Sequence, residues 1–375
     1  MINIIVVNHV AEQGGAENVL LTTLKHIDKH KFKVTAVLFQ EGILAEEIRS
    51  IGIEVVTLAA GRIRNVLHYV RTVLQIVREI KRARADIVIG WSPKPFIYAG
   101  AAAWLMRKPV LWWQHGYPSP ASRFDRLVSR LPAKAILCPS DSVAQAQNDL
   151  GARLKARVNY PGIETELFAY SALDREQIRE KYQIPAAAKI ITFIGRLQRW
   201  KRPDDVIEAF SRLQDEQYYL LVVGGALFGE ERDYIQELTG LAERLGCADH
   251  VVFAGHQTEI AKYLSASDIV INASSKEPFG LVVVEAMANG RIVIAVNSGG
   301  PAEIIDHNWN GLLYDGSREG LYQCLLQAVK NDTDTQSIGR RALKTAGESF
   351  SAGQMVSRFE GYLTDLYNEA QSIAR

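Results

Sequence analysis

Two carboxylates eight residues apart form the most informative chemical pattern in the sequence. Glu277 and Glu285 enclose Pro278, Phe279, Gly280, Leu281 and Val282. Gly280 permits a tight turn, and the apolar run 281–288 predicts a short helix that Gly290 ends. Free N–H groups at a helix start bind phosphate, and carboxylates accept hydrogen bonds from sugar hydroxyls. The pattern therefore predicts contact with a phosphorylated sugar, with a solvated acidic loop as its alternative.

Two cations occur where they could hold a diphosphate. Residues 189–194 form an apolar run that predicts a strand, and it leads into Gly195, Arg196 and Lys201. Gly195 permits close backbone approach, Arg196 can grip phosphate oxygens with two hydrogen bonds, and Lys201 supplies a mobile point charge. Two fixed cations would stabilise negative charge that develops on such a group without a metal ion. Two surface cations at a helix start are the alternative, which the helix dipole disfavours.

A glycine loop follows the first predicted strand. Residues 2–7 predict a buried strand, and the loop 9–15 leads into a helix whose N-terminus would face a ligand. The loop lacks the G-x-G-x-x-G pattern of dinucleotide sites, so a dinucleotide is not expected. Gly15 is the expected nearest contact. His9 and Glu17 could orient an acceptor, and capping or surface positions suit both equally well.

Four segments, in this order along the chain, are similar to motifs of the family 4 glycosyltransferases. They are Gly14-Gly15-Ala16-Glu17, Gly195-Arg196-Leu197-x3-Lys201, Glu277-x7-Glu285, and Gly299-Gly300-Pro301-Ala302-Glu303 with Asn310-Gly311-Leu312-Leu313. The resemblance covers essentially the whole chain and is strongest from 190 to 315. It implies an α/β protein of the GT-B fold, in which two doubly wound Rossmann-like domains face each other across a cleft.

The resemblance implies a role for each of these residues. Glu277 would contact donor-sugar hydroxyls, Glu285 the ribose, and the two cations the diphosphate. His115 follows the predicted strand 110–114 and would lie near the transferring sugar, whereas a structural histidine is its alternative. The loop 254–257 would border the base. The expected site comprises the catalytic residues His115, Glu277, Arg196 and Lys201, the donor-binding residues Gly15, Gly195, Gly255, Pro278, Phe279, Gly280, Leu281, Val282 and Glu285, and the acceptor-side residues His9 and Glu17.

The resemblance also implies the reaction. A hexosyl group would move from a UDP-, GDP- or ADP-sugar to a glycan or lipid-linked glycan in cell-surface polysaccharide or glycoconjugate synthesis, with retention of configuration. No cofactor and no metal are expected, since no C-x2-C or H-E-x-x-H signature occurs. Two alternatives stay open. One is a GT-B disaccharide phosphorylase or synthase with a small soluble acceptor, and the other is a non-catalytic nucleotide-sugar-binding subunit.

Length and charge indicate how the chain is divided. A chain of 375 residues exceeds one ordinary core, so an acceptor-binding domain at 1–165 and a donor-binding domain at 166–354 are expected. In GT-B folds the last helix, here 355–375, packs back on the first domain. Residues 1–165 contain 22 Lys and Arg and 13 Asp and Glu, a balance of +9, whereas the remainder balances to −8. The basic half should therefore bind an anionic partner. Nucleic acid is not expected as that partner, because the sequence contains no nucleic-acid recognition motif.

Two basic helices could provide that contact. The range 63–81 has apolar residues at helical spacing and basic residues opposite, and the range 122–131 is similar. A core-packed apolar face with a solvated basic face is the expectation, and contact with an anionic membrane surface is the alternative. Cys138, Cys247 and Cys324 lack metal-ligand spacing and are expected as reduced thiols. The resulting expectation is a cytoplasmic protein that could associate with the membrane surface.

Overall fold

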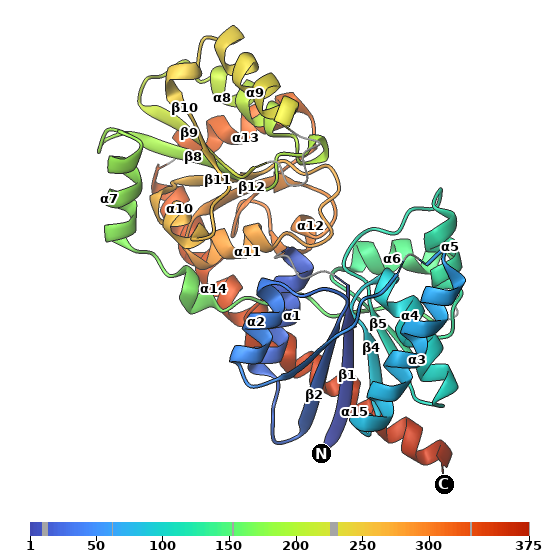
Figure 1. Ribbon diagram of the computed structural model, residues 1–375. Coiled ribbons are helices and arrows are strands. Elements are labelled where there is room, and N and C mark those ends of the chain that lie inside the picture. The colour runs from blue at the N-terminus through green and yellow to red at the C-terminus, as the bar shows by residue number, and fades with distance from the viewer. Residues whose placement is uncertain (10–13, 62, 152–153, 226–231, 331, 375) are drawn as a thin grey trace. The chain divides into compact units, whose positions relative to one another are not determined.

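Short β-branched runs that alternate with helices produce one parallel sheet in each of two units (Figure 1). The computed structural model describes residues 1–9, 14–61, 63–151, 154–225, 232–330 and 332–374. Met1–Gly162 and Ala352–Arg375 form the first unit, and Ile163–Ser351 form the second.

The first unit contains a seven-stranded sheet in the order β3-β2-β1-β4-β5-β6-β7, with every pairing parallel. Its strands are β1 (Ile2–Asn8), β2 (Phe32–Leu38), β3 (Glu54–Thr57), β4 (Ile87–Gly90), β5 (Val110–Trp113), β6 (Ala135–Cys138) and β7 (Arg157–Val158). Its helices are α1 (Gly15–His26), α2 (Ile43–Ser50), α3 (Val66–Arg82), α4 (Pro93–Leu105), α5 (Arg123–Ser129), α6 (Asp141–Asp149) and α15 (Ala352–Ala374).

The second unit contains a six-stranded parallel sheet in the order β10-β9-β8-β11-β12-β13. Its strands are β8 (Lys189–Ile194), β9 (Tyr218–Val223), β10 (Val251–Gly255), β11 (Ile269–Asn272), β12 (Ile292–Val296) and β13 (Leu312–Tyr314). Its α-helices are α7 (Ala172–Lys181), α8 (Pro203–Ser211), α9 (Arg232–Arg244), α10 (Ile260–Ala266), α11 (Leu281–Ala288), α12 (Pro301–Ile304), α13 (Arg318–Lys330) and α14 (Asp332–Ser349), and its short 3-10 helices are η1 (Thr165–Phe168), η2 (Arg199–Lys201) and η3 (Ala248–His250).

Both sheets are doubly wound. Their central strands are apolar on both faces, as in β12, where all five residues are buried, because helices cover each side of a parallel sheet. The strand order reverses beside β1 in the first unit and beside β8 in the second. Ligands of such sheets bind at the carboxyl ends of the strands where the order reverses. Each unit therefore has one edge where a site is expected.

The last helix, α15, belongs to the first unit although the second unit precedes it in the chain. It packs on α1, and its residues Phe359 and Leu363 are buried. The backbone N–H of Asp28, just after α1, donates to Glu360 Oε1 at 2.7 Å. The C-terminal helix thus completes the core on the α1 side of the first sheet.

One expectation about α3 is wrong. The helix begins at Val66, where the Asn65 side chain accepts a hydrogen bond from the N–H of His68 at 3.2 Å. Val73, Ile76 and Ile80 are buried as expected, but four further apolar residues of the same predicted face are exposed: Val66, Leu67, Val70 and Leu74. The apolar stripe is wider than the surface that α4 and the sheet can cover, so part of it faces outward.

Candidate functional site

The loops that follow β8 and β11 meet at the switch point of the second sheet. β8 leads into Gly195 and the 3-10 helix η2, and β11 leads into the loop that ends at Gly280. The backbone N–H of Ser275 donates to the carbonyl of Trp200 at 2.8 Å, and the Ser275 hydroxyl donates to the same oxygen at 3.1 Å. These bonds hold the loop that carries the two predicted cations against the loop that carries Glu277.

An ion pair links the two loops through predicted site residues. Lys201 Nζ lies 2.6 Å from Glu277 Oε2, and the two side chains are only 15% and 11% exposed. The amide of Asn272, the last residue of β11, donates to the same oxygen at 3.5 Å. Charges this far removed from water require partners, so each side chain fixes the other. Glu277 Oε1 has no partner among the described residues and can accept a hydroxyl hydrogen bond.

A backbone turn sets the direction of this carboxylate. Gly280 has a φ of +104°, and its carbonyl accepts from the N–H groups of Val283 and Val284 at 2.9 and 3.3 Å, which closes the first turn of α11. Leu281–Ala288 is the helix that the sequence predicted. The N–H of Gly300 donates to the carbonyl of Glu277 at 3.0 Å. The segment that starts α12 therefore packs directly on the Glu277 loop.

Gly300 is required there by packing, which the sequence alone did not reveal. A Cβ on Gly300 would lie 2.2 Å from the carbonyl oxygen of Phe279 and 2.3 Å from its Cα. We expect Gly300→Ala to lower the free energy of unfolding by about 1–3 kcal/mol, the usual cost of forcing an atom into a packed position. Chemical denaturation measures this. Gly347→Ala is the matched control, since a Cβ at Gly347 meets nothing within 4 Å, and it should be neutral or slightly stabilising.

Three glycines keep the neighbouring strand ends open. Gly195, Gly224 and Gly255 stand at the carboxyl ends of β8, β9 and β10. The N–H of Gly195 donates to Val223 at 2.9 Å, and that of Gly224 donates to Gly255 at 2.9 Å. A Cβ on Gly224 would lie 1.8 Å from the carbonyl oxygen of Gly195, so any side chain there would displace the loop that starts at Gly195. Gly224 is a second packing requirement that the sequence analysis did not assign.

Arg196 differs from the cations around it because its charge is unpaired. The side chain is exposed and makes no ion pair or hydrogen bond within the described part of the chain. Arg199, three residues on, pairs with Glu237 at 2.8 Å, and Lys201 pairs with Glu277. Arg196 is therefore the cation of this loop that is available to an anionic ligand.

Glu285 lies in the middle of α11, apart from this cluster. Burial raises the pKa of its carboxyl to about 7, so the acid is half-protonated near neutrality. No hydrogen-bond partner of its side chain occurs among the described residues. The structure thus brings Lys201, Glu277 and Gly300 together, and no direct contact joins Arg196 or Glu285 to them.

His115 occupies the corresponding edge of the first sheet, two residues beyond β5. Its ring stacks on Trp113 with centroids 5.4 Å apart and rests tilted on Trp91 at 5.1 Å. Phe359 of α15 packs on both tryptophans. Burial lowers the pKa of His115 to about 3, so the imidazole is neutral at ordinary pH. Its Nε2 is buried without a hydrogen-bond partner among the described residues, so this nitrogen could form a hydrogen bond with a hydroxyl group of a ligand.

His9, which was predicted on the acceptor side, lies at the same edge. His9 follows β1, and its Nδ1 is 3.4 Å from the hydroxyl of Ser92, which follows β4. Burial, with a smaller effect of Lys94, lowers the pKa of His9 to about 4. Trp91 Nε1 donates to the carbonyl of Ala16 at 2.9 Å and ties the start of α1 to the end of β4. The sequence motifs do not cover the end of β4, so they did not point to Trp91 and Ser92.

The glycine loop is only partly described. Of the loop predicted at 9–15, residues 10–13 lie outside the described residues. Gly15 starts α1, so it is placed at the helix N-terminus that the sequence predicted. Glu17 is buried in the first turn of α1, and its Oε2 would lie 2.7 Å from a Cβ on Gly14. A side chain at position 14 would therefore make the end of the flexible Glu17 side chain move.

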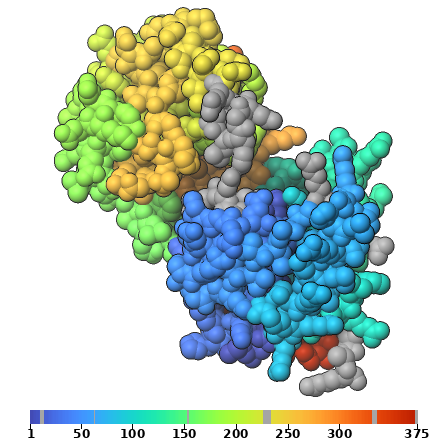
Figure 2. All heavy atoms as spheres, viewed as in Figure 1, coloured from blue at the N-terminus to red at the C-terminus, as the bar shows by residue number. Residues whose placement is uncertain are grey.

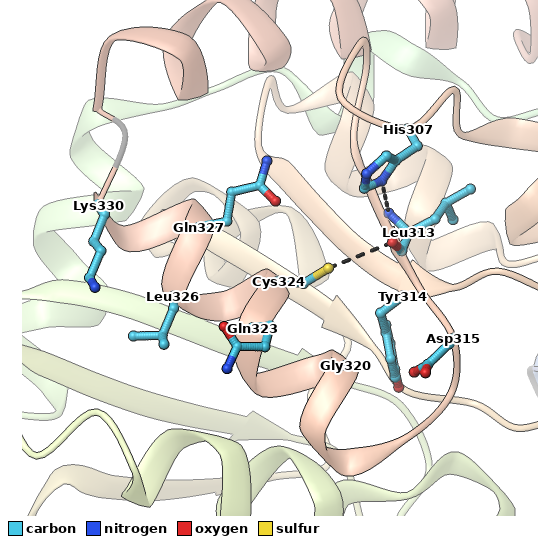
Figure 3. Close-up of a pocket in the computed structure, with 10 residues that line it drawn as sticks. All are labelled: His307, Leu313, Tyr314, Asp315, Gly320, Gln323, Cys324, Leu326, Gln327 and Lys330. Atoms are coloured by element: carbon cyan, nitrogen blue, oxygen red, sulfur yellow. Dashed lines mark hydrogen bonds between the residues drawn. The ribbon is translucent and has the colours of Figure 1, made fainter.

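The described parts of the chain also bear on metal binding, on membrane spans and on other pockets. No group of three or more His, Cys, Asp or Glu residues there could hold a metal ion, and no helix there is both long and apolar enough to cross a bilayer. An open pocket of about 600 Å³ lies between β13 and α13, where His307 Nδ1 accepts from the N–H of Leu313 at 3.0 Å (Figure 3). It contains none of the predicted site residues.

Solved structures of similar shape identify the class of protein. The chain resembles Anabaena HepE in complex with UDP and glucose with a TM-score of 0.87 at 25% identity, over 97% of this chain and 100% of that one. It also resembles a glycosyltransferase from Rickettsia africae with a TM-score of 0.87 at 23% identity, over 99% and 98%. Together with the two Rossmann-like units, these likenesses define a glycosyltransferase of the GT-B fold.

Family models then identify the family. The model for Glycosyltransferase Family 4 matches residues 13–167, and the model for Glycosyl transferases group 1 matches residues 174–345. The chain belongs to the family 4 glycosyltransferases, which confirms the resemblance inferred from its motifs.

Curated relatives have related activities. The chain is 27% identical over 351 residues to the lipopolysaccharide core biosynthesis glycosyltransferase LpsE of Rhizobium meliloti, covering 92% of this chain and 94% of LpsE. It is 33% identical over 202 residues to the N-acetyl-alpha-D-glucosaminyl L-malate synthase of Bacillus anthracis, covering 53% of this chain and 51% of that enzyme. The match spans about half of the second relative.

Proposed function

We propose that the protein transfers a hexosyl group, with retention of configuration and without a metal ion, from a UDP-sugar to a hydroxyl of a glycan or lipid-linked glycan. The observation that carries this proposal is the Lys201–Glu277 pair at the switch point of the second sheet, on whose first loop Arg196 is exposed and has no ion pair in the described part of the chain. A cation and an oriented carboxylate in one place suit a ligand that is phosphate at one end and sugar at the other.

In this proposal the site residues bind the donor and stabilise the charge that develops during transfer. Arg196 would hold the diphosphate, because Lys201 is already neutralised by Glu277. Glu277 would accept a hydrogen bond from a donor-sugar hydroxyl, the start of α11 would face the sugar or phosphates, and Glu285 would bind the ribose. As the glycosidic bond breaks, Arg196 would stabilise the charge that develops on the leaving diphosphate, which would also help to deprotonate the acceptor hydroxyl. The neutral His115 would orient a sugar hydroxyl by hydrogen bonding.

The comparisons support the donor and acceptor classes. UDP is favoured over GDP and ADP because HepE, 25% identical over nearly the whole chain, was solved with UDP and with UDP and glucose. A lipid-linked or surface-glycan acceptor is favoured by LpsE, the relative that matches along most of both chains. A cytoplasmic protein that works at the membrane surface would have access to both substrates.

A donor panel tests the proposal. Purified protein is incubated with UDP-, GDP- and ADP-sugars in the presence of EDTA, and release of the nucleoside diphosphate is followed with and without an acceptor glycan extract. We expect release from a UDP-sugar, unaffected by EDTA and lost in Glu277→Ala. A requirement for Mn²⁺ would contradict metal independence. Phosphate-dependent cleavage of a disaccharide with no nucleotide turnover would replace transfer with the phosphorylase alternative.

A further inference from the structure

The outer surface of α3 is apolar where solvent should favour polar side chains. Leu67 is 83% exposed, Val66 69%, Leu74 50% and Val70 46%. Residues 66, 70 and 74 follow each other at a spacing of four, so they form one row on the helix. Thr72, Val73, Ile76 and Ile80 fill the buried side of the same helix. The exposed row is therefore additional to the core-facing stripe and has no partner in the described part of the first unit.

The neighbouring helices carry further exposed apolar side chains. α4 packs against both α3 and α5, and the three helices lie side by side along the first unit (Figure 1). Trp104 and Leu105 at the end of α4 are 72% and 51% exposed, and Leu127 and Phe124 of α5 are 60% and 38% exposed. The segment around α3, coloured light blue, forms part of the surface in view in Figure 2. We refer to the exposed side chains of α3, the end of α4 and α5 as the outer face.

The segment that contains these three helices is also strongly basic. Residues 63–134 contain 13 Lys and Arg and 3 Asp and Glu, a balance of +10, whereas residues 1–165 as a whole balance to +9. One of the three acids, Glu79, is neutralised by Arg82 at 2.6 Å. Eight arginines of the region are exposed and have no ion pair in the described part of the chain: Arg64, Arg71, Arg78, Arg84, Arg107, Arg123, Arg126 and Arg130.

We propose that the outer face docks on the anionic surface of a lipid bilayer. Its exposed leucines, valines and tryptophan would enter the boundary between headgroups and acyl chains, while the arginines would bind lipid phosphates. A protein partner would need a complementary acidic surface, whereas an anionic bilayer satisfies the apolar row and the positive charge together. This inference goes beyond sugar transfer, because no residue of the outer face belongs to the candidate site.

Vesicle co-sedimentation of the full chain tests it. Wild-type protein is mixed with phosphatidylcholine vesicles, with or without about 30% phosphatidylglycerol, at low and high salt. We expect binding to the anionic vesicles alone, weakened as salt shortens the range of the electrostatic attraction. Leu67→Ser/Leu74→Ser should weaken binding by at least about tenfold, because these side chains can no longer leave water on docking. Arg71→Gln/Arg78→Gln should weaken it and reduce its salt dependence.

Matched substitutions and two further readouts separate docking from misfolding and from self-association. Leu173→Ser/Leu343→Ser removes leucines that are 64% and 50% exposed in the second unit, and it should bind like wild type. Thermal melts of all variants should coincide, since every substituted side chain is exposed. Wild-type protein that stays in the supernatant with anionic vesicles would overturn the proposal. So would outer-face variants that bind normally, or a wild-type dimer in solution that Leu67→Ser/Leu74→Ser dissociates, which would make the outer face a self-association surface.

Discussion

Arg196→Ala should lower kcat/KM for sugar transfer by about 10²–10³, because a fixed cation at a leaving group contributes roughly 2–4 kcal/mol to the transition state. The same substitution should leave the thermal melting temperature unchanged. Arg196 is exposed and forms no ion pair in the described part of the chain, so the folded state loses no contact with it. Steady-state kinetics with the donor identified by the panel, and calorimetric titration with UDP, measure both effects.

Two variants show whether the loss belongs to Arg196 itself. Arg199→Ala removes an equally exposed arginine from the same loop, one that pairs with Glu237, and it should change kcat/KM by less than about twofold. Arg196→Lys keeps the positive charge but cannot form the bidentate hydrogen bonds of a guanidinium, so its activity should lie between those of Arg196→Ala and the wild type. If Arg196→Ala turned over at the wild-type rate, the diphosphate would have to bind elsewhere.

The order of elements was predictable because the central strands and α11 have strong local signals. The run 189–194 is apolar except at Lys189 and Thr192 and became β8, and Gly280 and Gly290 delimit α11 at both ends. α4 was missed because its apolar residues run nearly continuously, without the periodicity that marks an amphipathic helix. The outward row of α3 was mistaken for core because a sequence shows which residues are apolar but not how wide a surface the neighbouring elements can cover.

The candidate site was predictable as segments but not as contacts. Motif spacing selected Lys201 and Glu277 separately, and their pairing depends on β8 and β11 being neighbours in the sheet, although 76 residues separate the two side chains. Gly224 and Gly300 are required by atoms of other loops, which only the folded backbone reveals. Trp91 likewise binds Ala16 and supports His115 from a strand end that the motifs do not cover.

Glu277→Gln should reduce both turnover and stability, whereas Arg196→Ala should affect turnover alone. Removing the carboxylate leaves the Lys201 ammonium, 15% exposed, without a counter-charge. Breaking a fully buried pair from one side costs roughly 3–5 kcal/mol, so we expect about 2–4 kcal/mol here, where some water remains. Denaturant unfolding measures this loss. Turnover should fall by at least about 10², because the neutral amide oxygen accepts a weaker hydrogen bond from the donor-sugar hydroxyl than the charged carboxylate does.

The double variant Lys201→Met/Glu277→Gln separates the two effects. Because both charges are removed together, stability should return to within about 1 kcal/mol of wild type, since a buried pair replaced by neutral groups of similar volume is often neutral. Activity should stay lost, because the donor-sugar hydroxyl still lacks the charged carboxylate as its acceptor. A double variant that regains turnover together with stability would limit the pair to holding the loops together. One that regains neither would mean that Lys201 and Glu277 act independently, against the 2.6 Å contact that joins them.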